Sequence, residues 1–168
     1  MRVFIDPYDP RWPELFEAER RLLDDVLARW LVAPIEHIGS TAVPGLAAKP
    51  VIDIMAPVES LEASRGAIEP LKPMSYCYFP YRDDVMHWFC KPGDEFRTHH
   101  LHLVPWRSTL WNERIAFRDA LRADSRLAMR YAALKRDLAH TYPDDREAYT
   151  DAKGGFIREA AMARRSKG

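Results

Sequence analysis

The spacing of apolar residues predicts helices at both ends of this chain and strands in its middle. From Trp12 to Trp30 apolar residues recur at helical spacing, in a helix that begins near Pro13 and ends before Pro34. After residue 106 the spacing is helical again, first over Leu110–Ala123. Two further helices follow, each preceded by a side chain suited to capping it. The last part of the chain is therefore expected to be a group of three helices.

Short apolar or alternating runs between these ends predict β-strands. The predicted strands cover residues 35–38, 51–58, 85–91 and 98–104. A Pro-Gly-Asp-Glu turn separates the last two, which is typical of a hairpin. A short broken helix over residues 43–48 and a weak helix over residues 59–71 complete the pattern. This order predicts one α+β domain over residues 1–168.

Composition excludes several classes of partner. Lys plus Arg and Asp plus Glu are both 25, so no overall charge attracts nucleic acid or a membrane surface. The N-terminus lacks the long apolar core of a signal peptide, and no apolar run is long enough to span a bilayer. Cys77 and Cys90 form no CxxC motif, and two buried thiols are favoured over a disulfide between them. We expect a cytoplasmic protein without a nucleic-acid or membrane partner.

The segment from His37 to Met55 holds the most informative candidates. Gly39, Ser40 and Thr41 lie between a predicted strand and a helix start, where backbone N–H groups and hydroxyls can bind a phosphate. Asp53 interrupts an apolar strand, so its carboxylate needs a partner, an open face or a metal ion. The alternative is a capped turn and a structural Asp53 bonded to backbone amides.

Several long motifs give the chain a resemblance over nearly its whole length. They are Tyr8-Asp-Pro-Arg-Trp-Pro, the run from His37 to Asp53, Thr98-His-His-Leu-His-Leu-Val, Phe117-Arg-Asp-Ala-Leu-Arg, Tyr131-Ala-Ala-Leu-Lys and Tyr149-Thr-Asp-Ala-Lys. With these motifs the chain resembles the GrpB (UPF0157) family. The resemblance implies a nucleotidyltransferase-like mixed β-sheet with helices on one side and a C-terminal helical cap. It also implies a link to coenzyme A synthesis, because related domains are fused to dephospho-CoA kinase.

Nucleotidyltransferases pair a Gly-Ser turn with an Asp-x-Asp or Asp-x-Glu strand that holds two metal ions near a triphosphate. This chain matches at Gly39, Ser40 and Asp53, but Met55 occupies the place of the second carboxylate. A thioether is a poor ligand for a hard cation. The departure puts the usual two-metal catalysis in doubt.

Two histidines of the hairpin can accompany Asp53. Side chains alternate along a strand, so His100 and His102 share one face, and Asp53 shares a face with Met55. If both strands belong to one sheet, Asp53, His100 and His102 converge and form a candidate catalytic and metal site. Such a set suits Zn²⁺ or Mn²⁺ better than Mg²⁺. The alternative is that both histidines are strand residues bonded to their neighbours.

Basic residues supply candidates for an anion pocket. They are Lys49, Arg82, Lys91, Arg118, Arg122, Lys135 and Lys153. The leading hypothesis is a nucleotide-binding protein that transfers a nucleotidyl group to a small acceptor with a divalent metal (Mg, Mn or Zn). Its partner would be a nucleoside triphosphate or another phosphorylated small molecule. The alternative is a non-catalytic accessory module that binds a ligand or a protein.

Overall fold

The computed structural model describes residues 4–166 of the chain. Its elements are, in order, α1 (Trp12–Val26), β1 (Glu36–Ile38), the 3₁₀ turn η1 (Ser40–Ala42), β2 (Ile52–Val58), α2 (Leu61–Ser64), η2 (Arg65–Ala67), α3 (Ile68–Leu71), η3 (Lys72–Met74), β3 (Cys77–Phe79), β4 (His87–Pro92), β5 (Arg97–Pro105), α4 (Thr109–Ala123), α5 (Ser125–Thr141) and α6 (Arg146–Ser166). Within residues 4–166, no helix combines the length and the apolar character needed to cross a membrane.

All five strands belong to one mixed sheet. Their order is β1-β2-β5-β4-β3, in which β2 and β5 run parallel and every other neighbouring pair is antiparallel. Parallel neighbours require a crossover, which the segment from α2 to β4 supplies. The β2–β5 register places Asp53 opposite His100 and Met55 opposite His102. The centre of the sheet therefore carries these four residues on one face.

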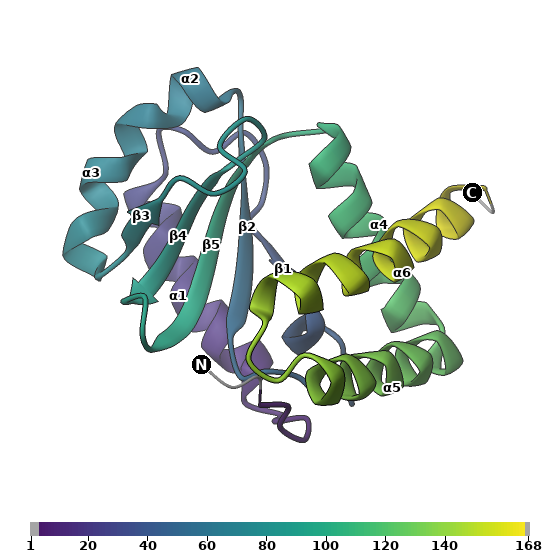
Figure 1. Cartoon of the computed structure of the whole chain (residues 1–168). Helices are drawn as coiled ribbons and strands as arrows, with labels where there is room; N and C mark the ends of the chain where they lie inside the picture. Colours follow the sequence, from purple (N-terminus) through teal and green to yellow (C-terminus); the bar gives the residue numbers. More distant parts are fainter. Residues whose placement is uncertain (1–3, 167–168) are drawn as a thin grey trace.

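The other face of the sheet packs on α1 and the short helices α2 and α3 (Figure 1). Proline in the first turn of α1 suits the start of a helix, because no helical hydrogen bond is lost there. Phe16 and Leu23 of α1 pack against Ile54 of β2 and Leu101 of β5, all of them buried. This layer is the main hydrophobic core.

A polar group is buried within the same layer. Glu19 of α1 is 6% exposed, accepts a hydrogen bond from the Tyr76 hydroxyl at 2.7 Å and pairs with the Lys91 ammonium group at 2.6 Å. His99 Nε2 lies 3.9 Å from the same carboxylate. A buried carboxylate needs such partners, because an unpaired charge in an apolar layer is costly.

The C-terminal helices lie on the opposite side from α1 (Figure 1). Helix α4 covers part of the sheet, where Trp111 packs with Met55 of β2 and Ile38 of β1. Beyond it, Phe117 of α4 and Tyr131 of α5 share a separate apolar cluster with α6. The predicted α+β fold is confirmed, with a mixed sheet, helices on one side and a C-terminal helical cap.

Local boundaries differ from the expected ones where tertiary contacts override the sequence pattern. The first helix ends at Val26 rather than Trp30, and the chain then turns so that Leu31 bridges to Val58 of β2. Residues 43–48 are not helical, because the helical turn occurs earlier, at Ser40–Ala42. Residues 59–71 form two short helices joined by a 3₁₀ turn at Arg65–Ala67. The edge strand β3 was not predicted.

We expect Glu19→Ala to lower the free energy of unfolding by about 3 kcal/mol, because it leaves the Lys91 ammonium group and the Tyr76 hydroxyl without their buried partner. Urea unfolding measures this change. Glu17→Ala is the matched control on the same helix, since Glu17 pairs with Arg20 at the surface and should cost less than about 1 kcal/mol. Equal losses for the two variants would contradict a structural role for the Glu19 pair.

Candidate functional site

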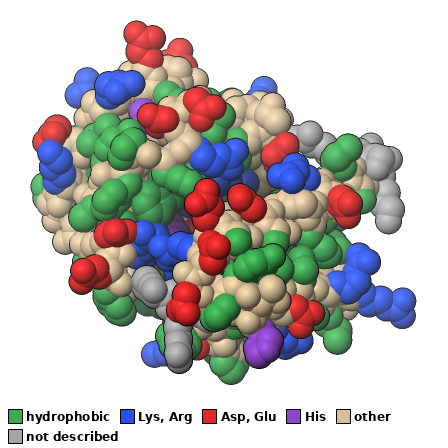
Figure 2. Space-filling view, in the orientation of Figure 1, with side chains coloured by type: hydrophobic (Ala, Val, Ile, Leu, Met, Phe, Trp, Pro, Cys, Tyr) green, Lys and Arg blue, Asp and Glu red, His purple; other side chains and the backbone are tan. Residues whose placement is uncertain are grey.

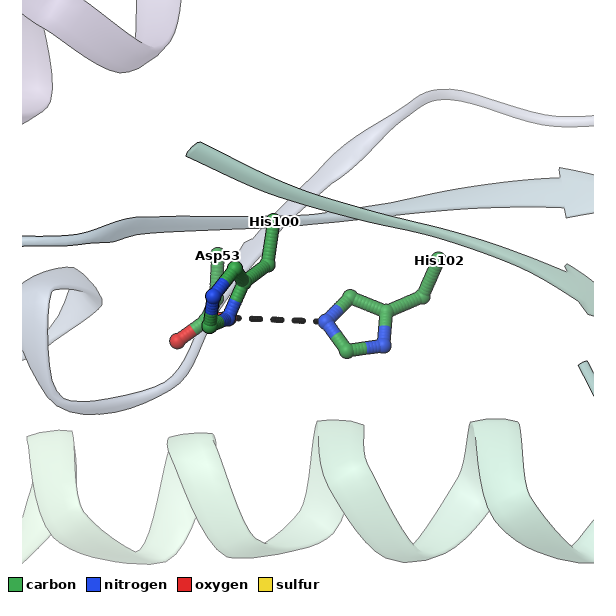
Figure 3. Close-up of side chains that lie close together, drawn as sticks. All are labelled: Asp53, His100 and His102. Carbon is green, nitrogen blue, oxygen red and sulfur yellow. Dashed lines mark hydrogen bonds and ion pairs between the residues drawn. The ribbon is translucent and has the colours of Figure 1, made fainter. Parts of the chain in front are cut away.

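Asp53 and two histidines meet at the centre of the sheet (Figure 3). The parallel register brings His100 Nδ1 to 3.1 Å and His102 Nε2 to 3.4 Å from Asp53 Oδ1. The side chains of Asp53, His100 and His102 are 28%, 17% and 9% exposed, so a small ligand could reach the carboxylate first. The structure thus brings together the three residues that strand alternation placed on one face. Their catalytic roles stay a prediction.

Hydrogen bonding fixes where His102 carries its proton. Arg114 Nη1 lies 2.9 Å from His102 Nδ1, and a guanidinium group can only donate. His102 Nδ1 must therefore hold the lone pair, and the hydrogen of the neutral ring is on Nε2, where it is donated to Asp53. Burial, followed by the charge of Arg114, lowers the pKa of His102 to about 4. His102 is consequently neutral near pH 7 and serves as a donor to Asp53.

His100 has one satisfied and one unsatisfied nitrogen. Its Nδ1 faces the carboxylate of Asp53 and donates to it. Its Nε2 is buried and has no hydrogen-bond partner among the described residues. The ring packs beside Trp88 at a centroid distance of 5.1 Å. His100 Nε2 is therefore a buried ring nitrogen that the described residues leave without a hydrogen-bond partner.

The carboxylate of Asp53 stays ionised in this setting. Burial alone would raise its pKa, but the hydrogen bonds from His100 and His102 outweigh burial and hold the pKa well below its usual range. Arg114 nearby keeps its charge, although burial lowers its pKa to about 10. The site thus contains a fixed negative charge with two imidazole donors.

Gly39 is the closest part of the Gly-Ser turn to this carboxylate. Its φ is +76°, a conformation that side chains rarely adopt. A Cβ atom at this position would lie 2.6 Å from Asp53 Oδ2. Glycine is therefore required both by the backbone conformation and by the close approach of Asp53.

The two hydroxyls of the turn have different surroundings. Ser40 Oγ accepts a hydrogen bond from Lys135 Nζ at 2.8 Å, and the same ammonium group donates to the Ala47 carbonyl at 2.9 Å. Thr41 is 2% exposed, donates to the Val51 carbonyl and contacts His37 Nε2 at 3.0 Å. Ser40 therefore connects the turn to α5, whereas the buried Thr41 connects it to the residue before β2. The phosphate-binding roles of both hydroxyls stay a prediction.

Three lysines, which we call the lysine cluster, interact electrostatically with Asp53: Lys49, Lys135 and Lys153. Burial lowers the pKa of all three, to about 8 for Lys49 and about 7 for Lys135. The charge of Lys153 lowers the pKa of Lys135 further, while Asp53 raises it. Figure 2 shows Lys and Arg side chains along the boundary between the strands and the C-terminal helices. These groups repel one another and would be stabilised by an anion.

Other predicted basic residues lie elsewhere. Lys91 is on the α1 face of the sheet, paired with Glu19. Arg118 pairs with Glu36 at 2.6 Å, and Arg122 donates to the Ala42 carbonyl at 2.9 Å. Both arginines line a groove of about 670 Å³ beside α1 and β1.

Arg82 occupies the loop before β4, and its charge reaches Arg114. Lys49, Lys135 and Lys153 thus interact electrostatically with Asp53, and Arg82 with Arg114, whereas Lys91, Arg118 and Arg122 pair with other groups. Their ligand-binding roles stay a prediction.

Sequence reasoning missed Arg114, although a signal for it exists. Arg114, Arg118 and Arg122 follow one another at i, i+4 spacing and so share one stripe of α4. The first of them lies closest to the β2–β5 centre, because α4 begins directly after β5. Extending the Arg118–Arg122 stripe by one helical turn toward the start of α4 identifies Arg114.

The residues present only partly match a divalent metal site. One ligand atom from each of Asp53, His100 and His102 lies within 4.8 Å of the others, which is a suitable spacing. Both histidine nitrogens that face Asp53 carry hydrogens, however, and Arg114 prevents His102 from moving its hydrogen to Nδ1. The spacing therefore fits a metal, whereas the protonation that these hydrogen bonds impose does not.

We expect Gly39→Ala to destabilise the fold by about 3 kcal/mol, through backbone strain and the clash with Asp53. Gly45→Ala is the matched control, since Gly45 also has a positive φ, of +81°, but nothing lies within 4 Å of the added Cβ atom. Urea unfolding of both variants separates strain from clash. If the two variants lose the same stability, the contact between Gly39 and Asp53 has no energetic weight.

Comparisons with known proteins identify several relatives of this chain by sequence. The glutamate-rich protein GrpB of Alkalihalophilus pseudofirmus is 36% identical over 94% of this chain and 92% of its own length. A UPF0157 protein of Bacillus subtilis is 35% identical over 95% of this chain, which spans 46% of that relative. A dephospho-CoA kinase of Mycolicibacterium paratuberculosis is 30% identical over 94% of this chain and 45% of its own length.

Solved structures agree with these sequence relatives. The crystal structure of GrpB from Enterococcus faecalis matches with a TM-score of 0.86 and 33% identity over 98% of both chains. The Cid1 poly(U) polymerase, solved with MgGTP bound, matches with a TM-score of 0.54 and 16% identity over 81% of this chain and 44% of that one. The fold is therefore nucleotidyltransferase-like. The family model described as GrpB protein matches residues 2–163, and the chain belongs to the GrpB family.

Proposed function

We propose that this chain binds a nucleoside triphosphate, or a closely related phosphorylated compound, on the Asp53 face of the sheet. The observation that carries the proposal is the 2.8 Å contact of Lys135 Nζ with Ser40 Oγ, in the Gly-Ser turn that lies against Asp53. Lys49 and Lys153 interact electrostatically with the same carboxylate. Desolvated, mutually repelling cations next to a Gly-Ser turn are suited to a polyphosphate. The nucleotidyltransferase-like fold supports the same ligand class, since Cid1 has been solved with MgGTP bound.

Aromatic side chains next to the site favour a nucleotide over a simple phosphate. Trp88 lies beside His100, and Tyr81 meets the Trp88 ring edge-on at 5.9 Å while remaining 49% exposed. An exposed aromatic ring is a suitable stacking partner for a nucleobase. A nucleotide could place its base near Tyr81 and its phosphates on the lysine cluster.

Transfer of a nucleotidyl group is the more specific form of the proposal. In it, His100 would serve as the general base toward an attacking hydroxyl, and His102 would hold Asp53 in place. The lysine cluster would stabilise the charge on the leaving phosphates. Each step uses a side chain already positioned on β2, β5 or the C-terminal helices.

The alternative is a non-catalytic module that retained the fold, either protein-binding or ligand-binding. Met55 favours it, because the position of the second carboxylate is fully buried in an apolar cluster with Trp111. The similarity to a dephospho-CoA kinase favours an accessory role in coenzyme A synthesis. The two proposals differ in whether a nucleotide binds at Asp53.

Calorimetry with ATP, GTP, CTP and UTP tests the proposal, with and without divalent metals. We expect micromolar binding of at least one nucleotide, and a loss of about tenfold in affinity for Lys135→Met and for Lys153→Met. Lys72→Met is the control, because this exposed lysine pairs with Glu69 on α3. Absence of binding to the unmodified protein under every condition would leave the module as the better proposal.

Comparing ATP with inorganic triphosphate tests the base position. Tyr81→Ala should weaken ATP binding by about fivefold or more through lost stacking, and should leave triphosphate binding unchanged. Phe96→Ala is the matched control, since Phe96 is 68% exposed on the turn after β4. Equal effects on both ligands would mean that Tyr81 does not contact a base.

A further inference from the structure

Lys49, Lys135 and Lys153 all interact electrostatically with the single carboxylate of Asp53. Lys153 Nζ lies 5.2 Å from the centre of the Tyr149 ring, and its electrostatic interaction is with Asp53. Lys135 is held by two neutral oxygens, those of Ser40 and Ala47. A site built to hold metal ions combines several carboxylates, whereas here three lysines interact with one carboxylate.

The hydrogens at the site oppose a metal ion. For His102 Nε2 to become a ligand, its hydrogen would have to move to Nδ1, which faces the N–H of Arg114 at 2.9 Å. Two N–H groups would then point at each other. Arg114 would have to leave His102 before a metal could bind all three residues.

The second metal position is also filled. In the sheet, Met55 lies one alternation after Asp53 on the same face, opposite His102. It is 0% exposed and packs with Ile38 and Trp111. An apolar, fully packed thioether leaves neither space nor oxygen for a hard cation.

We propose that the site binds the phosphates of its nucleotide without a divalent metal, with the ammonium groups of Lys49, Lys135 and Lys153 as the positive charge that pairs with them. This inference rests on the proposed function and adds that the nucleotide binds without a bound metal ion. The preferred ligand is the metal-free polyphosphate, because a bound divalent cation removes part of the negative charge that the lysine cluster attracts.

Arg114 has a distinct part in this arrangement. It positions His102 by fixing its tautomer, and His102 in turn donates to Asp53. Arg114 is a positioning residue that keeps the triad in its hydrogen-bonded form. Removing its guanidinium group should allow Asp53, His100 and His102 to act as a metal site.

The first experiment measures ATP affinity by calorimetry in EDTA and in excess Mg²⁺, Mn²⁺ or Zn²⁺. We expect binding in EDTA that is as tight as, or tighter than, binding with any metal. A metal that strengthens binding by more than about threefold would overturn the metal-free site and leave nucleotide binding intact. Absence of binding in every buffer would overturn the proposed function and this inference with it.

The second experiment titrates Zn²⁺ alone into protein without nucleotide. We expect Arg114→Met to bind Zn²⁺ about tenfold more tightly than the unmodified protein, because His102 Nε2 becomes free to ligate. Arg122→Met is the matched control, since it removes the same charge from the same stripe of α4 without touching His102. Equal zinc affinity for all three proteins, with thermal unfolding showing that both variants fold, would overturn the role of Arg114.

Discussion

The parallel pairing of β2 with β5 is the constraint on which the rest of this molecule depends. Its register sets Asp53 beside His100 and Met55 beside His102, so that one face carries the polar triad and the other the main core. A shift by one residue would turn these side chains to the α1 layer. The buried residues that alternate with them, such as Ile54 and Leu101, prevent that shift.

Around this pair, charge is arranged differently on the two faces. Below the sheet, Glu19 is matched by Lys91 and Tyr76, and the group is a closed structural network. On the other face, Asp53 accepts hydrogen bonds from His100 and His102, and Lys135 of α5 and Lys153 of α6 interact with the same carboxylate. The Glu19 group is therefore fully paired without a ligand, whereas the lysines that interact with Asp53 could also pair with an anion. This difference identifies the candidate site.

This chain retains the nucleotidyltransferase-like sheet and the Gly-Ser turn, but Met55 stands where the second acid would be. Met55 belongs to an apolar cluster that joins the sheet to α4, so the departure from the usual motif is part of the packing. Arg114 comes from the same helix and constrains His102. Helix α4 thus takes part both in closing the core and in setting the chemistry of the site.

The sequence by itself determined the α+β fold, the strands with Asp53, His100 and His102, and the faces that these residues share, because alternation and helical period follow from local geometry. The sequence could not show that Lys135 contacts Ser40 whereas Lys91 pairs with Glu19, because both are lysines in regular elements. It also missed Arg114, whose importance depends on a single ring nitrogen of His102. Only the tertiary structure decided these points, since the partner of a long side chain is set by which elements pack together and not by its own neighbours in the chain.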